Sequence, residues 1–132
     1  MVKKTELIDT NILVRYLTGD NPDQMKEIDK VFREAKKGKR SLILMPLVVA
    51  ETCFVLESNY KKPRNQVGEA FVKILTQRWL VIHERGELLF TISRYMEGIH
   101  FVDAYLTACA SMSGSGIFTF DKRLKREMVK YG

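Results

Sequence analysis

Residues 5–17 of the chain read TELIDTNILVRYL, and this stretch decides how the N-terminal part of the protein folds. A short apolar run ends abruptly at Asp9-Thr10-Asn11, and apolar residues then recur with helical spacing as far as Leu17. Asp, Thr and Asn are common where a helix begins, because their side chains accept hydrogen bonds from the amides of the first turn. The stretch therefore predicts a strand over 6–8 followed by a short helix over 11–17.

Apolar runs and helical patterns alternate along the rest of the chain. Further strands are predicted over 41–45, 79–83 and 117–120, and further helices over 22–37, 46–59, 64–77, 87–96, 102–111 and 122–130. Parallel strands need a crossover between them, and that crossover is usually a helix. The pattern therefore predicts the α/β class, with a three-layer α/β/α arrangement.

Composition limits the domain count and the compartment. The chain has 132 residues, of which 45% are hydrophobic and 29% charged, so we expect a single globular domain over residues 1–132. Cys53 and Cys109 lack the spacing of a metal or redox motif, which indicates a reduced compartment rather than a disulfide framework. Glu6 and Asp9 interrupt the apolar stretch that a secretory signal would need, so we expect no such signal. The longest apolar stretch is too short to cross a bilayer of roughly 30 Å. We expect a soluble, cytoplasmic protein that does not enter a membrane, and the net charge of +6 favours polyanionic partners.

Two carboxylates directly follow predicted strands. Ligands of open α/β sheets bind outside the carboxyl ends of the strands. Asp9 follows the first predicted strand and Asp121 follows the last, in the run IFTFD. Both side chains are therefore expected at the ligand-binding edge.

Two further carboxylates lie in predicted helices. Glu51 has only apolar neighbours one helical turn away (Leu47, Val48, Phe54 and Val55), so it is predicted on a buried face. A lone carboxylate on such a face needs a partner or a bound cation. Glu57, by contrast, has Lys61 four residues on and is predicted to face solvent. Asp103 lies in the first turn of its helix, on the same face as Leu106 and Thr107.

Each of these acids has a structural explanation when taken alone, for example as a helix-start acid that interacts with the helix dipole. Taken together they indicate a cation, because clustered carboxylates repel one another unless positive charge is bound among them. Magnesium prefers oxygen ligands, and a bound divalent cation can activate water and stabilise the leaving oxygen of a phosphodiester. Surrounding lysines and arginines would attract a nucleic acid to such a centre.

Four stretches, in this order, resemble the PIN-domain ribonucleases, especially the VapC toxins of toxin-antitoxin pairs. They are LIDTNILVRYL, the Glu of PLVVAETCFVLE, VDAYLTACA and IFTFDKRLKR, and the resemblance spans about residues 5 to 126. It implies a PIN-like domain with a central, mainly parallel sheet of four or five strands and helices on both sides. It also implies Mg²⁺ or Mn²⁺ at the acidic cluster and endonucleolytic cleavage of RNA. Family members often continue past the final helix into another short strand, whereas this sequence ends at MVKYG.

The resemblance also implies roles for single residues. Asp9 and Asp103 would be the principal metal ligands, Asp121 a further ligand, and Glu51 a ligand or an acid that orients metal-bound water. Asn11 would position Asp9, and Thr119 would support Asp121. Cations expected near RNA phosphates are Arg15, Lys122 and Arg123. An antitoxin protein and a second copy of the chain, in a homodimer, are the expected protein partners.

Two other classes of protein were weighed against this one. The first is a non-catalytic RNA-binding or protein-interaction module with the same fold, against which the complete set of acids argues. The second is an α/β enzyme with an Asp nucleophile, but phosphatases of that kind place a second Asp where Asn11 stands. No glycine-rich nucleotide-binding loop is present in the sequence.

Overall fold

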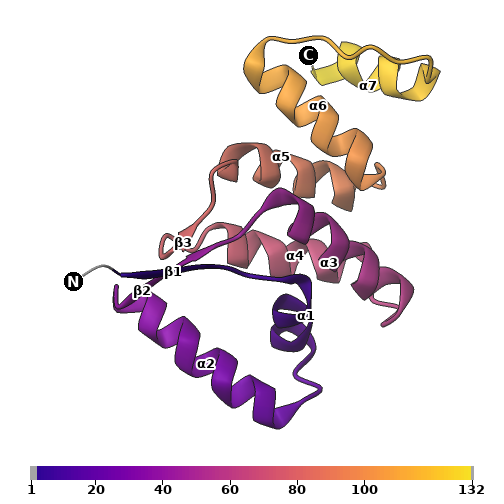
Figure 1. Cartoon of the computed structure of the whole chain (residues 1–132). Coiled ribbons are helices and arrows are strands. Elements are labelled where there is room, and N and C mark those ends of the chain that lie inside the picture. The colour runs from indigo at the N-terminus through magenta and orange to yellow at the C-terminus, as the bar shows by residue number, and fades with distance from the viewer. Residues whose placement is uncertain (1–2, 132) are drawn as a thin grey trace. The chain divides into compact units, whose positions relative to one another are not determined.

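The computed structural model describes residues 3–131, and these form seven helices and three strands (Figure 1). They divide into two compact units, one ending at His83 and one beginning at Glu84. The chain is α/β with a parallel sheet, which confirms the predicted fold class. None of the helices within residues 3–131 is both long enough and apolar enough to span a membrane.

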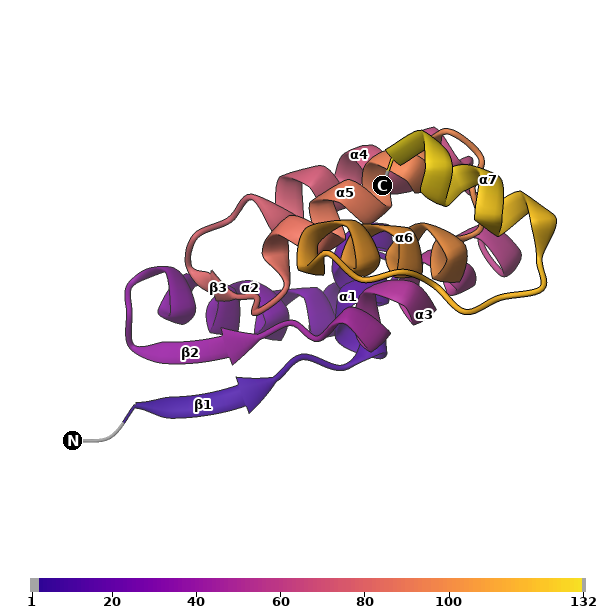
Figure 2. The ribbon, with the colours of Figure 1, turned by 90° about the horizontal axis from the view of Figure 1, so that it is seen from above.

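The first unit contains the sheet. Its elements are β1 (Lys4–Leu7), α1 (Thr10–Thr18), α2 (Pro22–Lys36), β2 (Arg40–Ile43), α3 (Pro46–Ser58), α4 (Arg64–Leu75) and β3 (Leu80–Val81). The strands are parallel in the order β1-β2-β3, with Leu42 of β2 paired to Glu6 on one side and to Leu80 on the other. Figure 2 shows β1 and β2 side by side and running in the same direction. The outer edge of β1 is therefore an edge of this sheet.

Local sequence explains where the first helices begin and end. Asp9 caps α1, and the αL residue Gly19 (φ 64°) closes it by donating its N–H to the Arg15 carbonyl. Asn21 caps α2 by accepting from the Gln24 amide, and Pro22 occupies the first helical position, where no amide hydrogen is needed. Helix α1 contacts both α2 and α3, and α2 also packs against β2. The fully buried side chains of this unit include Leu44, Val49, Phe71 and Leu75.

The second unit is helical. It consists of α5 (Arg85–Met96), α6 (Phe101–Ser113) and α7 (Lys122–Tyr131). Helix α6 packs against both α5 and α7. Leu88, Ile92 and Tyr95 of α5 are buried, as are the small residues Ala104 and Ala108 of α6, which allow two helices to approach closely.

The predicted fourth strand falls in the second unit, which has no other strand among its described residues. Residues 117–120 belong to no ladder in the described part of the chain, so the sheet has three strands there rather than the four or five expected. Phe118 and Phe120 are 92% and 89% exposed. The alternation of apolar residues and the high strand propensity of Ile, Phe and Thr favoured a strand, but a strand also needs a neighbouring strand to accept its hydrogen bonds.

Candidate metal centre

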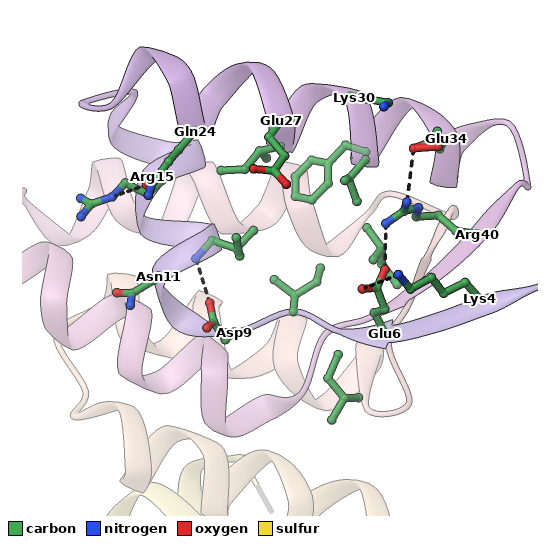
Figure 3. A pocket seen from close by; sticks show the side chains of 17 residues that line it. Lys4, Glu6, Asp9, Asn11, Arg15, Gln24, Glu27, Lys30, Glu34 and Arg40 are labelled. Atoms are coloured by element: carbon green, nitrogen blue, oxygen red, sulfur yellow. Dashed lines mark hydrogen bonds and ion pairs between the residues drawn. The ribbon is translucent and has the colours of Figure 1, made fainter.

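Asp9 lies at the carboxyl end of β1 and begins α1. Its Oδ1 accepts a hydrogen bond from the Ile12 amide at 3.0 Å, and its side chain is exposed. Asn11, in the first turn of α1, is also exposed. Asp9 and Asn11 both line a groove that is bordered by β1, α1 and α2 (Figure 3). The predicted position of Asp9 at the sheet edge is thus confirmed, and the same side chain serves as the helix cap.

Glu51 lies on α3 and is joined to α1 by a hydrogen bond. The hydroxyl of Thr10, the residue directly after Asp9, donates to Glu51 Oε1. This bond fixes one oxygen of the Glu51 carboxylate beside the first turn of α1. We assigned no role to Thr10 from the sequence, although its position directly after Asp9 could have indicated one.

The buried face predicted for Glu51 is wrong. Glu51 is exposed, and its neighbours Leu47 and Phe54 are 81% and 68% exposed. The buried residues of α3 lie on another face of the helix and are Val49, Thr52, Cys53 and Leu56. Helix α3 is apolar around most of its circumference, so periodicity could not indicate which side packs inward.

The prediction for Glu57 is also wrong. Its side chain is half-buried, and the guanidinium of Arg64 donates to it at 3.2 Å. The expected partner, Lys61, has a left-handed backbone (φ 54°) just beyond the end of α3. The helix ends at Ser58, so the four-residue spacing between Glu57 and Lys61 no longer places them on one helical face.

Asp103 and Asp121 belong to the second unit. Asp103 is half-buried in the first turn of α6. Asp121 precedes α7, and its Oδ1 accepts from the amides of Arg123 at 2.8 Å and Leu124 at 3.2 Å. The Thr119 hydroxyl accepts from the Asp121 amide at 3.0 Å, so a local hydrogen bond joins these two residues.

The chemistry of these side chains fits a hard divalent cation, which prefers carboxylate oxygens. At both helix starts the capping bonds use Oδ1, and Oδ2 of Asp9 and of Asp121 takes no part in those bonds. Residues 3–131 do not, however, hold a group of three or more acidic, histidine or cysteine side chains placed to bind a metal. The structure thus brings together Thr10 with Glu51 and Thr119 with Asp121, within their own units.

Arg15 takes part in a local polar network. Its guanidinium donates to Asp20 at 3.2 Å and to Gln24 at 3.0 Å, and the Tyr60 hydroxyl donates to the same Asp20 carboxylate at 2.8 Å. The hydrogen bonds from Tyr60 and Thr18, together with the charge of Arg15, hold the pKa of Asp20 below its usual value. No pattern in the sequence indicated the bond from Tyr60, which lies 40 residues after Asp20 in the chain. Lys122 and Arg123, the other cations predicted near RNA, are both exposed in the first turn of α7.

A buried arginine, Arg94, was missed by the sequence reasoning. It lies on α5 with its side chain 5% exposed, and its guanidinium lies 3.2 Å from Glu127 of α7 and 3.2 Å from Glu97. The pair Arg94–Glu127 joins α5 to the helix that Asp121 caps. A separation of 33 residues explains why no local pattern indicated this pair.

Comparison with known proteins gave one match. The family model described as PIN domain matches residues 7–127, a range that includes Asp9, Glu51, Asp103 and Asp121. No curated protein and no solved structure matched the chain.

Proposed function

The chain belongs to the PIN domain family, whose members are in general nucleases that need a divalent metal, and from this premise we propose that it is a metal-dependent RNA endonuclease. We further propose that it acts in the cytoplasm as the toxin of a type II toxin-antitoxin pair, with Mg²⁺ or Mn²⁺ as its cofactor. The observation that carries the proposal is the family match over a range that holds four carboxylates in the expected order.

Each carboxylate has a proposed task. Asp9, Asp103 and Asp121 hold the cation through their oxygens, and Glu51 orients the attacking water and accepts its proton. When bound, the cation supplies an activated water and charge to stabilise the leaving oxygen of the phosphodiester. The Thr10 hydroxyl supports this assignment, because its bond to Oε1 fixes the direction in which Glu51 offers its other oxygen. Asn11 and Thr119 position Asp9 and Asp121.

The cationic residues have the second task, which is to attract RNA. The exposed cations of α7, Lys122 and Arg123 among them, directly follow Asp121, so phosphates bound there would lie near a proposed metal ligand. Arg15 is a weaker candidate, since Asp20 and Gln24 already engage its guanidinium. An antitoxin that blocks this surface would need acidic side chains to match it.

The test is cleavage of total cellular RNA by the purified protein, with Mg²⁺, with Mn²⁺ or with chelator, followed by sequencing of the new ends. We expect new 5′-phosphate ends that require metal and that disappear in Asp103→Asn. Asp29→Asn is the matched control, because it removes one negative charge from an exposed position of α2. Identical ends from the wild type and from Asp103→Asn would contradict the proposal.

A second candidate function is a non-catalytic RNA-binding or protein-interaction module. The observation that favours it is that neither unit, among its described residues, holds by itself a group of three metal-binding side chains. Such a module would bind RNA equally well with metal or chelator, and it would produce no new ends at any protein concentration. RNA binding without cleavage by the wild type would therefore favour this second candidate.

A further inference from the structure

An aromatic cavity of about 400 Å³ lies within the first unit and is lined by residues of α1, α2, α4 and β3. Its lining residues fall between Ile8 and Leu80, so all of them belong to this one unit. Asp9 and Asn11 line a different groove. Sites for small ligands have volumes of roughly 300–1,000 Å³ and walls that are mostly apolar, with a few polar groups. The aromatic cavity has both properties, and the proposed metal chemistry does not use it.

Three aromatic rings from separate elements meet at this cavity. Phe32 of α2 contacts Tyr16 of α1 with ring centroids 4.9 Å apart, and it contacts Trp79 with centroids 5.4 Å apart. Phe32 is buried, whereas Tyr16 and Trp79 are half-buried and keep part of their surface open to solvent. The indole N–H of Trp79 donates to Gln77 at 2.9 Å, which fixes the orientation of the ring. The cavity therefore offers a rigid aromatic wall on which a flat ring can stack.

Two lysines accompany the aromatic wall. The ammonium group of Lys36 lies 5.4 Å from the centroid of the Trp79 ring, and the Lys36 side chain is exposed. Lys73 of α4 is also exposed and lines the same cavity, in which Glu69 is the one acidic lining residue. The charged lining residues thus carry a net positive charge. A ligand that matches both features has a flat ring for the wall and a negative charge for the lysines, as each nucleotide of a single strand does.

We propose that the aromatic cavity binds one unpaired nucleotide of single-stranded RNA, with its base stacked on Trp79 and its phosphate held by Lys36 and Lys73. The flexible side chain of Lys36 leaves the indole for the phosphate, and the base takes its place on the ring. Duplex RNA keeps its bases inside the helix, and an apolar protein segment would give the two lysines no anion. An unpaired nucleotide is therefore the better match for this set of side chains.

This inference rests on the proposed RNA endonuclease function and adds a second RNA contact to it. Ile8 lines the cavity and directly precedes Asp9 in the chain, so a nucleotide bound there lies in the unit that carries a proposed metal ligand. The cavity holds the strand, whereas the carboxylates act on the bond that is cut. Changes in the cavity should therefore alter RNA binding and leave the chemical step unchanged.

The first test uses the fluorescence of Trp79, which is the only tryptophan of the chain and so reports directly on the cavity. A short single-stranded RNA of mixed sequence is titrated into the purified protein in chelator, which prevents cleavage. We expect RNA to quench the emission, and we expect adenosine 5′-monophosphate to bind more weakly than the RNA does. Equal affinity for the mononucleotide would overturn the proposal, because the ligand would then be a free nucleotide. Emission that responds to an amphipathic peptide and not to RNA would also overturn it.

The second test concerns the two lysines. Each phosphate contact with a single strand contributes about 0.7 to the slope of the logarithm of the binding constant against the logarithm of the salt concentration. Lys36→Gln and Lys73→Gln should therefore each make this slope shallower by about 0.7. Lys39→Gln is the matched control, because Lys39 is also exposed and carries the same charge but does not line the cavity. An equal change in all three variants would mean that RNA responds only to the overall charge, and it would overturn the proposal.

The third test fills the cavity and leaves the aromatic rings and the lysines unchanged. Ala70 lines the cavity from α4 and is half-buried, and both Ala and Leu favour a helix. Ala70→Leu should abolish the quenching and weaken RNA binding at least about fivefold, the lower end of what one stacked base contributes. Val72→Leu is the control, because Val72 is exposed on the same helix and lies outside the cavity. Unchanged RNA binding by a folded Ala70→Leu protein would overturn the proposal.

The same experiments separate this inference from the proposed function, because binding is measured without cleavage. If RNA quenches Trp79 in chelator but metal produces no new ends, the nuclease function fails and the nucleotide site stands. If metal-dependent cleavage occurs while saturating RNA leaves the Trp79 emission unchanged, the function stands and the nucleotide site is overturned. Where both hold, Ala70→Leu should raise the KM of cleavage and leave kcat unchanged, since it removes binding of the strand and not of the reacting bond.

Discussion

The starts of α1 and α7 have similar sequences but different surroundings. In each, an apolar run ends in an aspartate, ELID at Asp9 and FTFD at Asp121, and in each the aspartate accepts hydrogen bonds from amides of the following helix. The run before Asp9 includes a paired strand and the buried Ile8, whereas the run before Asp121 belongs to no ladder among the described residues of its own unit, and Phe120 is 89% exposed. A helix cap is thus a local property of the sequence, whereas a strand depends on a partner elsewhere.

The largest contrast is expected from truncating the residue before each aspartate. Ile8→Ala should lower the free energy of unfolding by about 3 kcal/mol, because Ile8 is 4% exposed and its removal leaves a cavity. Phe120→Ala should change the free energy of unfolding by less than about 0.5 kcal/mol, because Phe120 is 89% exposed. Urea unfolding of both variants measures the difference, and equal losses would mean that the two runs are equally packed.

The next largest effect on stability is expected from the contacts that hold α1 and α7 in place. Helix α1 buries Leu13 and Val14, whereas α7 buries Leu124 and depends on the ion pair between Arg94 and Glu127. Arg94→Gln should cost about 2 kcal/mol, less than for a fully buried pair because Glu127 is 18% exposed. In Arg94→Gln, amide hydrogen exchange should be accelerated most in α7, because that helix has lost its ion pair to α5. Arg33→Gln, on the exposed side of α2, is the control and should exchange its amide hydrogens as the wild type does. If the amides of α7 exchange no faster in Arg94→Gln than in this control, the role given to Arg94 is contradicted.

The caps themselves should behave alike. Asp9→Ala and Asp121→Ala should each cost about 1 kcal/mol, while the corresponding Asn variants should cost much less because Asn also accepts the capping bonds. Thermal unfolding without added metal provides the comparison. A large cost for either Asn variant would mean that the charge of the aspartate, and not its capping oxygen, stabilises the fold.

The smallest effect is the pH dependence that arises from Asp20. Its folded-state pKa lies below the usual 3.8, mainly because the Tyr60 hydroxyl donates to it. A lowered folded-state pKa contributes stability that is present above the unfolded pKa and is lost as pH falls through the folded value. Tyr60→Phe should therefore be less stable than the wild type above about pH 4, and the gap should narrow at lower pH. Tyr16→Phe, which removes a hydroxyl outside this network, should show no such narrowing.

Sequence reasoning predicted the features that arise from local interactions. The alternation of strands and helices and the cap at Asp9 follow from neighbouring residues. It failed where distant residues decide the outcome. Residues 117–120 have the composition of a strand but belong to no ladder in the described part of the chain, and α3 is too uniformly apolar to indicate that Glu51 is exposed. The Arg94–Glu127 pair and the Tyr60–Asp20 bond join residues too far apart for any periodic pattern.

The most direct measurement of the central claim is calorimetric titration of Mn²⁺ into the wild type, Asp9→Asn, Asp121→Asn and the control Asp29→Asn. If the two capping aspartates serve one metal centre, both Asn variants should lose Mn²⁺ affinity by at least about tenfold, since each removes a charged ligand while keeping the helix cap. Asp29→Asn should bind as the wild type does. Unchanged affinity in both capping variants, or a loss in only one of them, would contradict a single centre built from Asp9 and Asp121.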